Sequence, residues 1–135
     1  MSPQKPKPSS TITDAELTIL KALWDGGPGT VRELLERLGT DWAYTTVQTL
    51  LTRLADKGHV RADRKDLAHV FVATGSRDEL AMLQVQEVAG TLLDGAVAPL
   101  VLRLVEQGRF SSEEIARFRE LLAAAEKKAR RGGKP

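Results

Sequence analysis

The sequence contains four places where a serine or threonine is followed three residues later by a glutamate. These pairs are Thr13 and Glu16, Thr30 and Glu33, Ser76 and Glu79, and Ser111 and Glu114. Each pair matches a capping box, in which the hydroxyl accepts from a helical N–H and the glutamate accepts from the N–H of the capping residue. Each also opens a stretch with apolar residues at helical spacing. Four such helix starts predict a mainly α-helical chain.

Glycines and apolar periodicity set the expected limits of the helices. GGPG at 26–29 ends the first helix, and Gly39, Gly58 and Gly108 are expected to end later ones. The expected helices cover 14–25, 31–38, 43–57, 76–93, 99–108 and 112–130.

The periodicity changes after the third helix. HVRADR (59–64) alternates apolar and polar residues, and HVFVA (69–73) is β-branched and aromatic. With KDLA (65–68) as the turn, these segments predict a two-stranded hairpin in which residue 64 faces residue 69. Three helices followed by such a hairpin is the order of a winged helix-turn-helix.

This order predicts two folded parts and two tails. Residues 13–75 are expected to form the winged helix, in which the hairpin is the wing, and 76–130 an all-helical dimerisation region. Residues 1–12 and 131–135 carry lysine, arginine, proline and glycine and are expected to be disordered basic tails. The helical region is small for a domain that folds alone, and a second copy would cover its apolar stripes. The residues expected in that interface are Leu80, Leu83, Val88, Leu92, Leu100, Leu104, Ile115, Phe118 and Leu122.

Composition narrows the class of protein. The chain has no cysteine, which excludes disulfides, thiolate metal sites and cysteine nucleophiles. No apolar run is long enough to span a membrane, and MSPQKPKPSS has no apolar core of a signal peptide. We therefore expect a cytoplasmic protein with no membrane partner.

The helix expected at 43–57 has an unusual polar face. Val47, Leu50, Leu51 and Leu54 fall on one arc of the helical wheel. The opposite arc carries Thr45, Thr46, Thr49 and Arg53. Short hydroxyls suit a helix in a DNA major groove, where threonine offers a hydrogen bond and a methyl for thymine, and arginine reaches guanine or phosphate. The alternative is a surface helix that happens to be rich in threonine.

Basic residues follow this helix and occupy the wing. Lys57, Arg61, Arg64 and Lys65 are expected to contact the DNA backbone and to supply sequence-independent, salt-sensitive affinity. The alternative for the wing is a charged edge that discourages aggregation.

The residues form no constellation typical of an enzyme, and no metal or cofactor is expected. His59 and His69 would lie far apart along the hairpin, and the carboxylates sit at helix starts where capping explains them. Two classes of function remain: a dimeric operator-binding repressor, or a winged-helix module whose threonine face meets a protein. A small-molecule-sensing regulator is a third possibility, since a pocket between the helices is compatible with the sequence.

The segments TDAELTILKALW, TVRELLERL and AYTTVQTLLTRLADKGHV together resemble the penicillinase-repressor family of bacterial regulators. The resemblance runs from about residue 13 to 125. It implies a homodimer that places its third helix in each half of a palindromic operator, with Thr46, Thr49 and Arg53 at base-contacting positions. Thr45 stands where some members carry a basic residue.

The resemblance also implies how repression ends. The copper-responsive branch uses a cysteine-rich metal site, which this chain cannot form. In the β-lactam-responsive branch, linked to antibiotic resistance, a membrane-bound sensor protease triggers cleavage in the dimerisation region. The corresponding bond is Arg103–Leu104, which differs from the asparagine–phenylalanine pair of some members.

Overall fold

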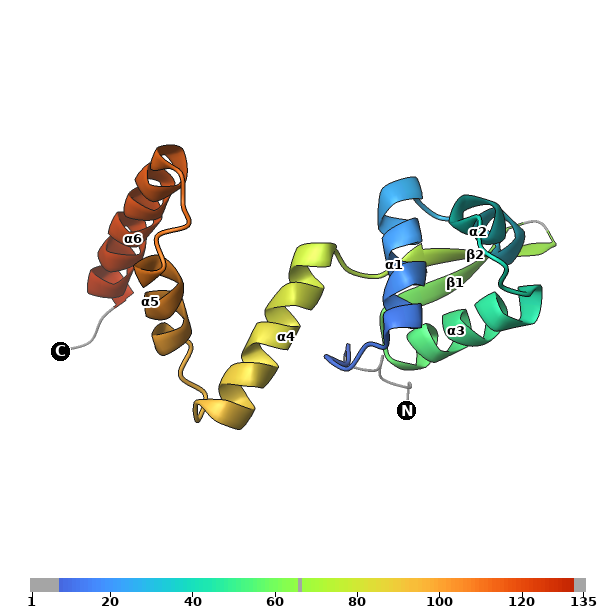
Figure 1. The fold of residues 1–135 in the computed structure, drawn as a ribbon, viewed down its shortest axis with the longest axis horizontal. Helices are drawn as coiled ribbons and strands as arrows, with labels where there is room; N and C mark the ends of the chain where they lie inside the picture. Colours follow the sequence, from blue (N-terminus) through green and yellow to red (C-terminus); the bar gives the residue numbers. More distant parts are fainter. Residues whose placement is uncertain (1–7, 66, 133–135) are drawn as a thin grey trace. The chain divides into compact units, whose positions relative to one another are not determined.

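The computed structural model describes residues 8–65 and 67–132. Within these residues, three helices and a hairpin are followed by three further helices, in the expected order. Figure 1 traces these elements along the chain. The elements are α1 (Asp14–Gly26), α2 (Val31–Leu38), α3 (Tyr44–Asp56), β1 (Val60–Lys65), β2 (Ala68–Ala73), α4 (Arg77–Leu92), α5 (Ala98–Glu106) and α6 (Ser112–Gly132).

All four predicted capping boxes are present. In α1, the Glu16 N–H donates to Thr13 Oγ1 at 3.1 Å and the Thr13 N–H donates to Glu16 Oε1 at 2.9 Å. The same reciprocal pair of bonds opens α2, α4 and α6. Helix α3 differs, because its capping residue is Ala43 and no side chain accepts from its first turn.

Helices α1, α2 and α3 pack around one apolar core. Each turns its leucine or isoleucine stripe inward, as the periodicity predicted. The fully buried apolar side chains are Ile19, Leu20, Leu34, Val47, Leu51 and Leu54.

The two strands pair antiparallel, and Arg64 faces His69 as expected. Gly29, in the turn between α1 and α2, exchanges two backbone hydrogen bonds with Phe71 at 3.1 and 2.8 Å. Arg37 holds the same turn by donating to the carbonyls of Gly27 and Pro28. These bonds fix the base of the wing against the helices.

The first turns of α4 belong to the winged helix. Leu80 is 5% exposed and lies in the same core as the residues of α1 to α3. The Trp24 indole N–H donates to the Gly75 carbonyl at 2.9 Å, and the Arg77 guanidinium lies over the Trp24 ring. The first compact unit therefore continues through α4 to Gly95, and the second unit begins at Ala96.

The second unit contains α5 and α6. Phe110 and Phe118 pack edge to face, with ring centroids 4.9 Å apart. Neither helix has a buried residue. Within the described residues, no helix has the length and apolar character needed to cross a membrane.

The structure changes the expectation for the N-terminal segment. The Ser9 N–H donates to the Lys57 carbonyl at 2.9 Å, and the Ile12 side chain packs against the core. Ser9 and Ile12 therefore contact the winged helix, and residues 1–7 of the predicted arm lie outside the described residues. At the other end, α6 includes Arg131 and Gly132, and only 133–135 of the predicted tail lie outside.

Candidate nucleic-acid interface

The predicted reading residues lie together on α3. Thr45, Thr46, Thr49 and Arg53 are exposed and line one shallow depression in the surface. The opposite side of the same helix is closed, because Val47, Leu51 and Leu54 are each 0% exposed, and Leu50 is 6% exposed. The position of α3 is thus fixed by its leucines, and its threonines are free to meet another molecule.

The exposed polar face of α3 contains more residues than the sequence predicted. Gln48 and Thr52 lie on it too, and the Thr52 hydroxyl donates to the Gln48 carbonyl at 3.0 Å. Gln48 lines a groove of about 460 Å³ together with Tyr44 of α3 and Leu67 and His69 of the wing. The helical spacing of Gln48 from Thr45 and Thr52 was a signal that could have identified it.

Lys57 is held away from this face. Its ammonium lies 2.6 Å from Glu16 Oε1 and donates to the Thr11 carbonyl at 3.0 Å. Burial by itself raises the pKa of Glu16, but hydrogen bonds from Lys57 and Thr13 and the charge of Lys57 outweigh it and lower that pKa. A carboxylate that is 1% exposed needs a cation, and in this structure Lys57 supplies it.

The hairpin register separates the two wing arginines. Side chains alternate along a strand, so Arg61 and Arg64 lie on opposite faces. Arg61 forms two hydrogen bonds to the carboxylate of Asp63, at 2.9 and 3.1 Å. The bonds from Arg61 lower the pKa of Asp63, and those to Asp63 raise the pKa of Arg61.

Arg64 is on the face of the hairpin that also carries His69. It is directly opposite His69, which lines the groove beside Gln48. Lys65 pairs with Ala68 at the end of the hairpin, and its side chain lies outside the described residues. Of the two wing arginines, Arg64 is therefore on the same face of the hairpin as His69.

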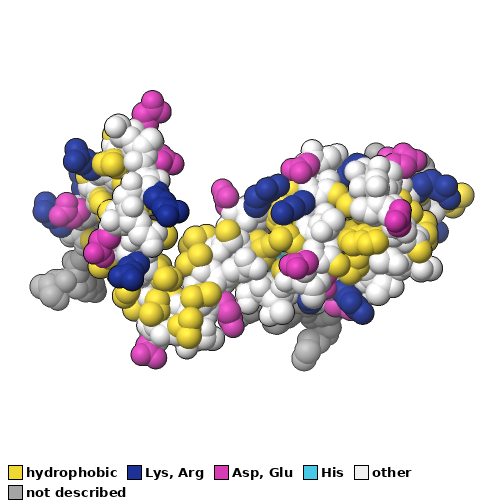
Figure 2. Space-filling view, viewed as in Figure 1, with side chains coloured by type: hydrophobic (Ala, Val, Ile, Leu, Met, Phe, Trp, Pro, Cys, Tyr) yellow, Lys and Arg dark blue, Asp and Glu magenta, His cyan; other side chains and the backbone are white. Residues whose placement is uncertain are grey.

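The predicted dimer residues divide into two groups. Leu80 is buried in the winged helix and is not available to a second copy, and Leu83 lines a cavity of the same unit. Leu100 and Phe118 are half-buried within the second unit. The others are exposed large hydrophobic residues: Val88 (42%), Leu92 (76%), Leu104 (54%), Ile115 (42%) and Leu122 (69%). Figure 2 shows such hydrophobic side chains open to solvent on α4 and on the α5–α6 unit.

The predicted cleavage bond lies inside α5. Both Arg103 and Leu104 are exposed, but the Arg103 carbonyl accepts from the Gln107 N–H at 3.1 Å. The bond is therefore accessible at the surface and is held in helical backbone.

The histidines do not share a site. His59 is 7% exposed and stands before β1, where its carbonyl accepts from Thr74, whereas His69 is on the wing. Across 8–65 and 67–132, no group of three or more histidine, cysteine or carboxylate residues is placed to hold a metal ion.

The sequence of this chain is similar to those of known transcriptional regulators. Residues 12–124 match the family model described as penicillinase repressor. The transcriptional regulator BlaI of Mycobacterium tuberculosis is 37% identical over 128 residues, covering 92% of this chain and 90% of that protein. The penicillinase repressor of Bacillus licheniformis is 30% identical over 115 residues, covering 82% of this chain and 88% of that protein. A solved transcriptional regulator of Thermotoga maritima covers 92% of this chain and 80% of its own, with 21% identity and a TM-score of 0.47.

Proposed function

Because the chain belongs to the penicillinase repressor family of transcriptional regulators, we propose that it acts as a homodimer that binds a palindromic operator. In this proposal α3 enters the major groove of each half-site and the wing contacts the adjacent backbone. The observation that carries it is the exposed polar face of α3 opposite a fully buried leucine face.

The side chains on that face suit contact with base edges. A threonine hydroxyl forms hydrogen bonds and its methyl contacts the thymine methyl, so Thr45, Thr46 and Thr49 suit A·T pairs. Arg53 has the reach and the two donor groups to bind O6 and N7 of guanine. Gln48 adds an amide of the kind that pairs with the adenine edge. Because the threonines are short, the backbone of α3 is able to approach the bases closely.

Arg64 supplies the expected phosphate contact of the wing. Its pairing with His69, which lines the same groove as Gln48, supports this contact. Arg61 contributes less in this proposal, because its guanidinium is already paired with Asp63. Each phosphate contact releases counterions, so binding weakens steeply as salt is added.

The second copy covers the apolar residues that are exposed on α4, α5 and α6. An apolar surface of this extent is unusual on a monomer that stays soluble by itself. A symmetric dimer covers both copies of the surface at once and presents two α3 helices to the two halves of a palindrome. The chain would act in the cytoplasm, where its operator lies.

Cleavage of the Arg103–Leu104 bond would end repression by cutting the dimer surface. The loss of one half-site forfeits the gain in affinity that two linked sites provide. The agent would be a membrane-bound sensor protease, as the family resemblance implies. Co-expression with such a protease tests this step, because a full-length protein that persists after inducer challenge contradicts it.

The main experiment is to identify the bound DNA and then to change one side chain. Sequencing the genomic fragments retained by the purified protein should give a palindrome. Arg53→Ala should then weaken operator binding by about 1–3 kcal/mol and relax the preference at one base pair of each half-site. Arg109→Ala, which removes an exposed arginine beyond α5, is the matched control and should change little.

A protein-interaction module predicts a different outcome. Such a module would show equal, weak retention of all duplexes, and Arg53→Ala would then have no more effect than Arg109→Ala. That result would replace the operator proposal.

A further inference from the structure

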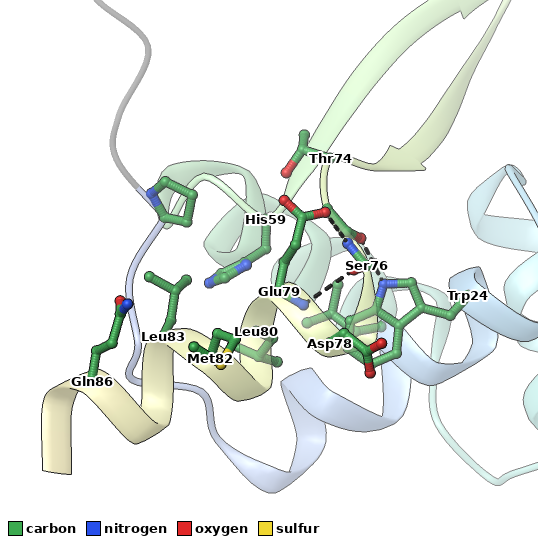
Figure 3. A pocket seen from close by; sticks show the side chains of 13 residues that line it. Trp24, His59, Thr74, Ser76, Asp78, Glu79, Leu80, Met82, Leu83 and Gln86 are labelled. Carbon is green, nitrogen blue, oxygen red and sulfur yellow. Dashed lines mark hydrogen bonds between the residues drawn. The ribbon is translucent and has the colours of Figure 1, made fainter. Parts of the chain in front are cut away.

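A cavity of about 380 Å³ lies within the first unit, away from the reading face of α3. Its walls come from Pro8, from α1, from His59, from the segment after β2 and from α4. Figure 3 shows the side chains that surround it. Its volume is within the range of pockets that bind small molecules.

The walls are mainly apolar. Leu20 and Trp24 of α1 face Leu80, Met82 and Leu83 of α4 across it. The Trp24 ring is fixed by the hydrogen bond to Gly75 and by Arg77 on one side. A rigid indole and flexible methionine and leucine side chains provide good packing for a flat apolar molecule.

The charged residues of the lining are all acidic. Asp78 and Glu79 line the cavity, and the described lining contains no lysine or arginine. The Glu79 carboxylate already has a partner within the chain, since it accepts a hydrogen bond from the Ser76 N–H at 3.0 Å. Asp78 has no such bond among the described residues, so its carboxylate is free to pair with a cationic group of a ligand, beside the negative charge that Glu79 keeps. An anion would be repelled and a cation attracted.

His59 provides a directional contact. Its Nε2 is hydrogen bonded to the Ser9 carbonyl, which only accepts, so Nε2 carries a proton. In the neutral ring Nδ1 is then an acceptor, and Nδ1 has no partner among the described residues. His59 is 7% exposed and lines the cavity. A ligand with a hydrogen-bond donor would satisfy this atom.

We infer that this cavity is a binding site for a small aromatic molecule that is neutral or cationic and carries a hydrogen-bond donor. The site is separate from operator binding and does not depend on it. A ligand there would contact the N-terminal segment, α1 and α4 together. Its binding would therefore favour the arrangement in which α4 is packed on the winged helix.

Three probes that share one ring system and differ in charge test the site: naphthylmethylamine, naphthylmethanol and naphthoate. The chain has two tryptophans, so its NMR spectrum has two indole N–H signals, and only Trp24 lines the cavity. The amine and the alcohol should shift the Trp24 signal and leave the Trp42 signal in place. Naphthoate should bind at least about tenfold more weakly than the amine.

Asp78→Asn tests the origin of the charge preference. It should weaken binding of naphthylmethylamine by about three- to tenfold and leave naphthylmethanol unchanged. Glu87→Gln, on the same helix but outside the lining, is the matched control and should change neither. The inference is overturned if no probe shifts Trp24, if both indoles shift equally, or if naphthoate binds as well as the amine. The titration contains no DNA, so its result is independent of the operator proposal.

Discussion

The two units of the chain use their apolar residues in opposite ways. In the winged helix, Leu34, Leu51 and Leu54 are 0% exposed, and α1 to α3 enclose them. In the α5–α6 unit, Leu102 is 63% exposed and Leu122 is 69% exposed, and neither helix has a buried residue. Both units are helical and have similar apolar spacing. The difference is that only the first contains the surfaces that cover its own stripes.

This difference separates two sources of stability. The winged helix gains its free energy of folding from contacts within one chain, which do not depend on protein concentration. In the proposed dimer, the α5–α6 unit gains stability from the surface that a second copy supplies, and this gain rises with concentration. Substitutions in the two units should therefore have different effects.

The largest effect is expected in the winged-helix core. Leu51→Ala removes a side chain that is 0% exposed and should lower the free energy of unfolding by about 2–5 kcal/mol. Because the lost contacts are internal, this decrease should be the same at low and high protein concentration. Chemical denaturation at two concentrations measures it. A decrease that depends on concentration would show that the core is shared with a second copy.

Leu122→Asp should act on association instead. A carboxylate on the exposed apolar face of α6 must be desolvated when that face is covered, so the dissociation constant of the proposed dimer should rise by at least about tenfold. Analytical ultracentrifugation measures the change. Leu67→Asp is the matched control, because Leu67 is 91% exposed on the wing and should not affect association. If the two variants associate equally well, α6 is not part of the proposed dimer surface.

The sequence predicted the helices and strands well because their signals are local. The capping boxes, the stop at Gly39 and the pairing of Arg64 with His69 depend on residues close together in the chain, and all were found. The exposure of Thr45, Thr46, Thr49 and Arg53 was predicted for the same reason. A helix with Val47, Leu51 and Leu54 on one side must place its threonines on the other.

The sequence was less informative about contacts between distant residues. The pair of Lys57 with Glu16 joins residues 41 positions apart, and nothing near Lys57 indicates it. Leu80 fits the α4 stripe as well as Val88 does, but only the fold shows that Trp24 and the core take up the first turns of this helix. The cavity beside His59 is likewise formed by segments that are far apart in the chain.

Lys57→Met tests the distant pair directly. It leaves the carboxylate of Glu16 buried without its cation and should lower the stability of the winged helix by about 2 kcal/mol at neutral pH. Lys21→Met, on the exposed side of α1, is the matched control and should have little effect.

The pH dependence of stability identifies the mechanism of this loss. The pKa of Glu16 is lower in the folded chain than its ordinary value of 4.5, so the stabilisation is present above pH 4.5 and is lost as the pH falls through the folded-state pKa. In Lys57→Met this loss at acidic pH should become smaller, because the folded-state pKa of Glu16 rises. An unchanged pH profile in the variant would mean that Lys57 acts only through its bond to Thr11.

The smallest effect is expected at the helix starts, where the two units are most alike. Ser76→Ala and Ser111→Ala each remove one hydroxyl that accepts from a backbone N–H at 3.1 Å, so each should cost about 1 kcal/mol. The two substitutions should destabilise their own helix starts by the same amount, but the effect on the whole unit should differ. Ser76→Ala should destabilise the winged helix equally at all concentrations, whereas Ser111→Ala should also weaken association, because α6 carries exposed residues that a second copy would cover. Hydrogen exchange of the N–H groups of Glu79 and Glu114, measured at two protein concentrations, distinguishes these outcomes. If the exchange at Glu114 does not depend on concentration in either the parent chain or the variant, α6 folds without a partner and the contrast between the two units fails.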